Sequence, residues 1–90
     1  MHEMSLIRDI MEKIHGIASR ENAPRVEKVT ITIGAMAHIS ADHFKEHFYE
    51  AAMGGPAESA ALEVIEDSDI HNPLAQEIIL NSVVVATAAP

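Results

Sequence analysis

The first apolar pattern in the chain has the period of an α-helix. Between Met4 and Arg20, apolar residues recur every three or four positions, which places them in one stripe along a helix. Gly16 weakens the last turn of this segment slightly, and Asn22 and Pro24 end it. The sequence therefore predicts an amphipathic helix whose buried stripe consists of Ile7, Ile10, Met11, Ile14, Ile17 and Ala18.

The second pattern has a period of two residues. Val29, Ile31 and Ile33 alternate with polar residues over 28–33, and Gly34 follows. This alternation is typical of a strand with one buried face.

A second helix is predicted from Ser40 to about Met53. Ser40 is a favourable N-cap residue, and Asp42 in the first turn suits the helix dipole. The run 54–56, Gly-Gly-Pro, ends the helix. We expect its apolar ridge to anchor the core, because it holds the only two phenylalanines of the chain: Phe44, Phe48 and Ala51.

The remaining elements are two strands, 62–66 and 77–85, with a loop over 67–75 between them. The predicted class is α+β: a small mixed sheet of three strands with two helices packed on one face, in a single domain over 1–90. The last strand is apolar on both faces, which normally means that both are covered. We therefore expect a second copy or a partner on the face away from the helices. We expect one face to carry Ile79, Val83 and Val85 and the other to carry Ile78, Leu80 and Val84.

Composition excludes several classes of protein. A net charge of −8 argues against binding to nucleic acid or to an anionic membrane surface. The absence of cysteine excludes disulfides and thiolate zinc sites. Neither a signal peptide nor a membrane-spanning apolar run is found, so a cytoplasmic location is expected. No nucleophile or phosphate-loop signature is present, and we expect a binding protein, not an enzyme.

The start of the chain, Met1-His2-Glu3, carries the strongest candidate chemistry. A free α-amine, the His2 imidazole and the backbone amide between them can chelate one divalent ion in a plane. Such a nitrogen-rich, tetragonal set suits Ni(II) or Cu(II) better than Zn(II) or Mg(II). The alternative is that His2 is an ordinary terminal residue without a role.

A second candidate metal site lies on the predicted helix 40–53. His43, His47 and Glu50 share one helical face and could bind a divalent ion. The alternative is a solvated face beside the phenylalanine ridge. His38 sits at a strand-to-helix turn where it could approach another site, whereas His15 and His71 are isolated in the sequence.

Several segments together resemble the HypA/HybF family of nickel metallochaperones. They are the start MHEMSL, the strand VTITIG and the stretch GGPAESAALEV, in this order. The resemblance covers roughly 1–66 and implies a mixed three-stranded sheet that holds Ni(II) at the N-terminus. The implied ligands are the Met1 amine, the His2 amide and imidazole, and the Glu3 amide or side chain. The implied partners are a hydrogenase large subunit and a maturation GTPase.

Two departures from the family pattern stand out. Family members carry a lobe with two CxxC pairs that binds a structural zinc, and here the short run 67–75 replaces it. Without that lobe, the last two strands are expected to join as a simple hairpin. Members also commonly have an acidic residue after the strand-ending glycine, where this chain has Ala35.

Two functions follow as hypotheses. The first is a zinc-less nickel-binding accessory protein for maturation of a [NiFe]-hydrogenase or a similar nickel enzyme. The second is a non-metal interaction or scaffold module of the same fold, which assembles with itself or a partner through the apolar last strand.

Overall fold

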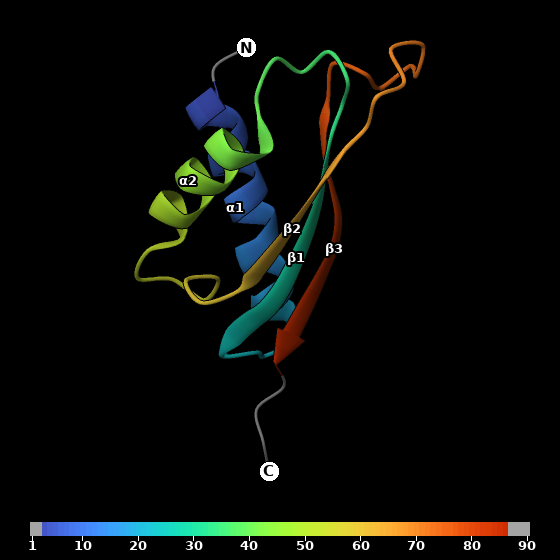
Figure 1. The fold of residues 1–90 in the computed structure, drawn as a ribbon. Coiled ribbons are helices and arrows are strands. Elements are labelled where there is room, and N and C mark those ends of the chain that lie inside the picture. The colour runs from blue at the N-terminus through green and yellow to red at the C-terminus, as the bar shows by residue number, and fades with distance from the viewer. Residues whose placement is uncertain (1–2, 87–90) are drawn as a thin grey trace.

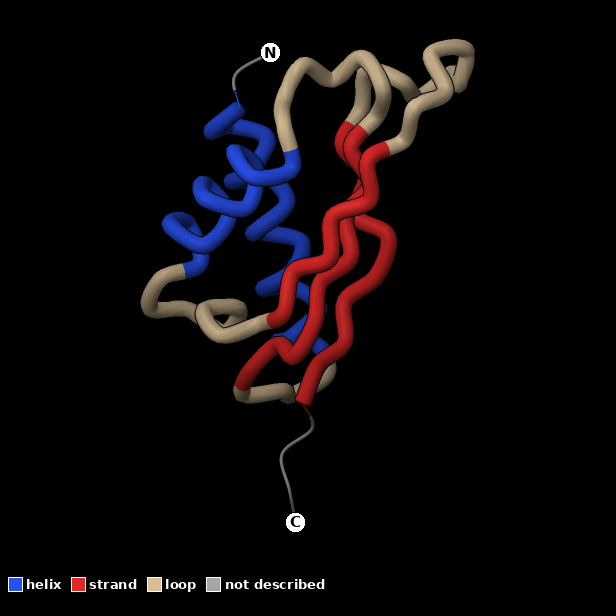
Figure 2. The backbone as a smooth tube through the Cα atoms, in the orientation of Figure 1, coloured by secondary structure: helices blue, strands red, loops and turns tan. Residues whose placement is uncertain are grey.

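The computed structural model describes residues 3–86. Two helices lie against one face of a three-stranded sheet, and the other face of the sheet is open (Figures 1 and 2). This arrangement confirms the predicted α+β class. The elements are, in chain order, α1 (Glu3–Arg20), β1 (Arg25–Ile33), α2 (Ala41–Ala52), β2 (Ala61–Glu66) and β3 (Ile78–Ala86).

The order of strands across the sheet is β2-β1-β3. β1 pairs with β2 in parallel and with β3 antiparallel. The expected hairpin of the last two strands was therefore wrong, because β2 and β3 lie on opposite edges. The physical reason is α2, which returns the chain along the sheet and lets β2 enter parallel to β1. The free edge of β1 is then taken by β3.

The connection between β2 and β3 crosses over the end of β1. The Gly34 N–H donates to the Glu77 carbonyl at 2.9 Å, and the Met36 N–H donates to the Ala75 carbonyl at 2.7 Å. A Cβ atom at position 34 would overlap the carbonyl group of Ala75 and lie 2.8 Å from the Leu74 oxygen. Close approach of two backbones therefore requires glycine at this position.

The crossing connection is built from successive side-chain-capped turns. Asp67 accepts hydrogen bonds from the Asp69 N–H and from the Asn72 side-chain amide, each at 3.0 Å. These bonds, the Asp69 N–H foremost, lower the pKa of the Asp67 carboxyl from its usual value of 3.8. The segment that stands in place of the expected zinc lobe is therefore hydrogen-bonded within itself.

A β-bulge changes the two faces that were predicted for the last strand. Thr30 pairs with Ser82 but Ile31 pairs with Leu80, so Asn81 is an extra residue on β3. The bulge reverses the alternation, so the prediction that Val83 and Val85 share a face with Ile79, and Val84 with Ile78 and Leu80, was wrong. Four apolar side chains of β3 pack together against the core, namely Ile78, Leu80, Val83 and Val85.

The open face of the sheet is mixed in character. Ile79 and Val84 lie on it, and Val84 is 47% exposed. The same face carries a hydrogen bond from the Thr32 hydroxyl to the Asn81 side-chain oxygen at 2.7 Å. It also carries an ion pair of Lys28 and Glu63 at 3.1 Å. The argument for a covering partner, which depended on a fully apolar second face, loses most of its basis.

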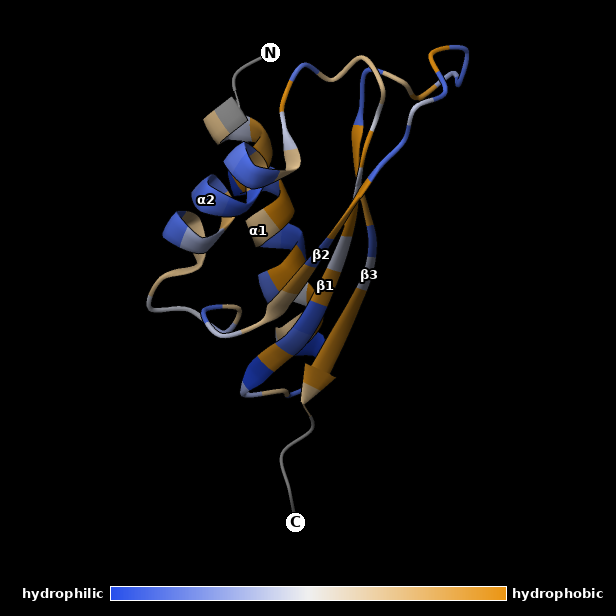
Figure 3. Cartoon of the chain, in the orientation of Figure 1, coloured by the Kyte–Doolittle hydropathy of each residue, from blue (hydrophilic) through white to orange (hydrophobic). Residues whose placement is uncertain are grey.

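The core lies between the helices and the sheet. Phe44 and Phe48 are completely buried, as predicted, but the third member of their ridge is Ala52, because Ala51 faces outward. In α1 the predicted stripe is buried except for Ile17, which is half-buried. In Figure 3 the visible surface of α2 is mostly hydrophilic, in keeping with one buried and one solvated helix face. Within residues 3–86 no helix is both long and apolar enough to cross a bilayer.

Candidate metal centre

α1 begins within the predicted chelating segment. Its first residue is Glu3, the last of the three predicted ligands. Met1 and His2 lie outside the described residues, and the same holds for the side chain of Glu3. The Met1-His2-Glu3 nickel site therefore stays a prediction, but its anchor, the first turn of α1, is defined.

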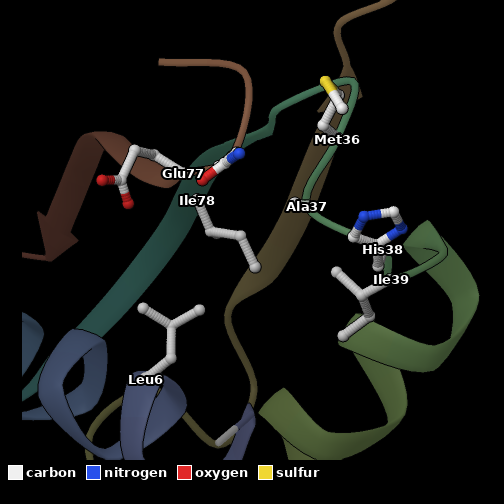
Figure 4. Close-up of a pocket in the computed structure, with 8 residues that line it drawn as sticks. Leu6, Met36, Ala37, His38, Ile39, Glu77 and Ile78 are labelled. Carbon is white, nitrogen blue, oxygen red and sulfur yellow. The ribbon is translucent and has the colours of Figure 1, made fainter. Parts of the chain in front are cut away.

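A hollow opens beside the first turn of α1. It has a volume of about 460 Å³ and lies between Leu6 of α1, the turn 36–39 and the beginning of β3 at 76–78. Figure 4 shows Leu6 and Ile78 pointing into the hollow, with His38 and Glu77 on opposite sides of it. The hollow is thus a cleft with an apolar floor and polar residues at its rim, next to the first turn of α1.

His38 reaches the rim because of an uncommon backbone conformation. Its φ angle is +60°, in the left-handed region that non-glycine residues seldom adopt. The prediction that this turn brings His38 towards another site is compatible with its place at the hollow. Glu77 was not predicted as a rim residue, because no pattern in the sequence indicates that β3 begins next to the turn after β1.

The second predicted site is brought together only in part. His43 and His47 lie on successive turns of α2, and their Nε2 atoms are 2.9 Å apart. The N-cap Ser40, which accepts a hydrogen bond from the His43 N–H at 3.1 Å, fixes the first of these turns. Glu50 does not join them, since residues 3–86 contain no group of three or more histidine, cysteine, aspartate or glutamate side chains arranged to hold a metal ion.

The remaining histidines are separate from these sites. His15 is exposed on α1, where its ring lies near Gly55. His71 is exposed in the connection between β2 and β3, and its N–H donates to the Asp69 side chain at 2.9 Å. Both agree with their description as isolated residues, and they serve below as control positions.

The fold defines a class, that of small α+β domains in which an N-terminal helix precedes a mixed three-stranded sheet. The chain belongs to the HypA family, since residues 1–71 match the family model described as hydrogenase/urease nickel incorporation, metallochaperone, hypA. This membership confirms the resemblance noted in the sequence, and the family is one of metallochaperones, not of enzymes.

Curated relatives agree with this assignment. The hydrogenase maturation factor HypA of Dechloromonas aromatica (strain RCB) is 37% identical over 65 residues, which are 72% of this chain and 58% of the relative. That of Rhodopseudomonas palustris (strain TIE-1) is 36% identical over 66 residues, 73% of this chain and 58% of the relative. The matched region thus spans less than two thirds of these relatives.

Solved structures confirm the fold. The solution structure of the Ni metallochaperone HypA from Helicobacter pylori has a TM-score of 0.81 to this chain at 14% sequence identity. It covers 98% of this chain and 100% of that one. A second structure, titled solution structure of HypA protein, has a TM-score of 0.77 at 17% identity and covers 98% of each chain.

Proposed function

We propose that this chain is a nickel-binding accessory protein that holds one Ni(II) ion at its N-terminus. The ligands are the Met1 amine, the His2 backbone amide and imidazole, and the Glu3 amide or side chain. The observation that carries the proposal is the sequence Met1-His2-Glu3 directly ahead of α1, in a chain whose residues 1–71 match a nickel metallochaperone family.

The start of α1 assists this chemistry. A planar nitrogen chelate needs deprotonated backbone amides, which carry negative charge. The N-terminal end of a helix bears a partial positive charge that stabilises an anion nearby. Because Glu3 is the first helical residue, its backbone amide lies at this end of the helix dipole.

The proposed role is delivery of nickel to a [NiFe]-hydrogenase or a similar nickel enzyme in the cytoplasm. The names of the relatives, hydrogenase maturation factors, support this client. The large subunit of the hydrogenase and a maturation GTPase are the proposed partners. The hollow at Leu6 and Ile78 lies beside the first turn of α1, and we propose it as the surface that such a partner meets.

We propose further that the chain works without a structural zinc ion. It has no cysteine, so a cysteine zinc site cannot form from this sequence. The hydrogen-bonded turns of 67–77 hold the connection between β2 and β3 without a metal. Homodimerisation through the open sheet face stays a prediction, since that face holds both Ile79 and an ion pair.

Calorimetric titration of Ni(II) into tag-free protein tests the proposal. We expect one N-terminal site in the unaltered chain, weakened at least about tenfold, or about 1.4 kcal/mol, by His2→Ala. His15→Ala is the matched control, because it removes an exposed imidazole of α1 that lies about 18 Å along the helix axis from Glu3. Equal nickel affinity in the unaltered chain and in His2→Ala would overturn the proposal. Mass spectrometry of each sample establishes that the terminal amine is unblocked.

A further inference from the structure

We propose that His43 and His47 form a second metal site, specific for ions that prefer square-planar or tetragonal coordination, such as Cu(II) and Ni(II). The two imidazoles project from successive turns of α2, with their Nε2 atoms 2.9 Å apart. The site is composed of helix residues alone, so it does not depend on the proposed N-terminal chelate.

The separation of the two nitrogens matches the distance between two neighbouring nitrogen ligands of one metal ion. Bonds from a metal to imidazole nitrogen are about 2.0–2.1 Å long, so two nitrogens 2.9 Å apart subtend about 90° at an ion that binds both. A right angle is the angle between neighbouring ligands in planar and octahedral complexes. A tetrahedral ion such as Zn(II) requires the pair to open.

The rings are also inclined in a suitable way. Their centroids are 4.6 Å apart, and the ring planes differ by 45°. Two imidazoles pointing head-on would have more distant centroids, because two ring radii would add to the 2.9 Å between the nitrogens. The rings are therefore not aligned head-on along the line between the nitrogens, and binding of one ion by both nitrogens likewise needs rings tilted away from that line.

The helix supplies a favourable charge. Asp42, Glu46 and Glu50 are exposed on α2 beside the pair, and the chain has a net charge of −8. Such surroundings favour a divalent cation through long-range attraction, although none of these carboxylates completes a three-residue ligand group with the histidines. Water completes the coordination of the bound ion.

Proton release distinguishes this site from the N-terminal chelate. Binding of an ion to the lone pairs of two imidazoles displaces no backbone amide proton. The 2.9 Å contact needs one ring to donate and the other to accept, and a metal needs both lone pairs, so the shared proton moves to the other ring nitrogen. A chelate that includes backbone amides must instead lose the amide protons.

The experiment is a Cu(II) and Ni(II) titration of the His2→Ala protein at about pH 8 in two buffers of different ionisation enthalpy. We expect one remaining site with near-zero proton release, weakened at least about tenfold by adding His43→Ala or His47→Ala. Zn(II) should bind less tightly than Cu(II). Glu50→Gln and His15→Ala are controls that should leave this site unchanged.

A rescue variant tests the geometry directly. Ala51 is exposed and lies four residues after His47, so adding Ala51→His to His43→Ala recreates the same spacing one turn further along α2. Binding should return in this double variant. Unchanged metal affinity in His43→Ala and His47→Ala, each shown to be folded by circular dichroism, would overturn the second site. Loss of binding only in His2→Ala would leave the N-terminal chelate as the sole site.

Discussion

Gly34 ends β1 at the place where the connection between β2 and β3 passes over the sheet. Its N–H donates to Glu77, and its missing side chain leaves room for the carbonyl group of Ala75. The glycine thus couples the end of β1, which leads to His38, with the start of β3, which leads from Glu77. Both sides of the hollow beside α1 depend on this one contact.

A pair of glycine substitutions measures this coupling. Gly34→Ala should lower the free energy of unfolding by about 1–3 kcal/mol, because the new methyl group overlaps backbone atoms that cannot move independently. Gly16→Ala is the matched control, since nothing lies within 4 Å of its added Cβ. It should stabilise α1 by about 0.5–1 kcal/mol. Urea denaturation checks both, and a Gly34→Ala protein as stable as the unaltered chain would contradict the packing described.

Among single residues, the sequence indicated ligand types but not distances. The chelating power of His2 follows from its chemistry at position two, with no need of a fold. The spacing of His43 and His47 predicted a shared helix face. The 2.9 Å between their nitrogens, and the separation of Glu50 from them, depend on rotamers that periodicity does not specify.

At the scale of elements, the hydrophobic pattern predicted the helices and strands that the structure describes. The connections between them were harder to predict. The order strand, helix, strand over 25–66 contains the signal for a parallel pair, because a helix between two strands brings the chain back to the same end of the sheet. The hairpin expectation ignored that signal. The sequence contains no comparable signal for the bulge at Asn81. One extra residue leaves the number of apolar residues in the strand unchanged, but it moves the residues on one side of the bulge to the opposite face of the sheet.

Two deletions in β3 test whether the bulge sets the faces. Deletion of Asn81 alone leaves Ile78, Leu80, Val83 and Val85 at alternate positions, so all four still share the face that packs on the core. We expect it to cost little more than the hydrogen bond from Thr32, about 0.5–1.5 kcal/mol in the free energy of unfolding. Deletion of both Asn81 and Ser82 places Ile78 and Leu80 opposite Val83 and Val85, and should cost more than about 2 kcal/mol. Equal stabilities of the two deletion variants in urea would contradict the faces described.

The whole molecule is a HypA-family domain whose three-stranded sheet forms without the cysteine-containing lobe that is expected of the family. Its sequence covers 58% of the curated relatives, yet the fold matches solved HypA structures over nearly all of its residues. The crossing connection 67–77 is the whole of the chain between β2 and β3. Stability must come from the core of the two helices and the sheet, centred on Phe44 and Phe48.

Metal removal tests this account of the whole fold. If the chain folds without a structural ion, as proposed, dialysis against a chelator should leave the thermal midpoint within about 1 °C. A structural zinc contributes about 10 kcal/mol or more in small zinc domains, so its loss would unfold a chain of this size. Added Ni(II) should raise the midpoint, and the chelator should return it to the starting value. A large fall on chelation alone would contradict zinc-independent folding.

The absorption spectrum of the Ni(II) complex tests the central claim most directly. Tag-free protein with one equivalent of Ni(II) should show a weak d–d band in the visible region, as planar nitrogen ligation produces, together with release of amide protons. The band should disappear in His2→Ala and persist in His47→Ala, because paired imidazoles with water give a different ligand field. A spectrum that is the same with and without His2 would contradict nickel binding at the start of the chain.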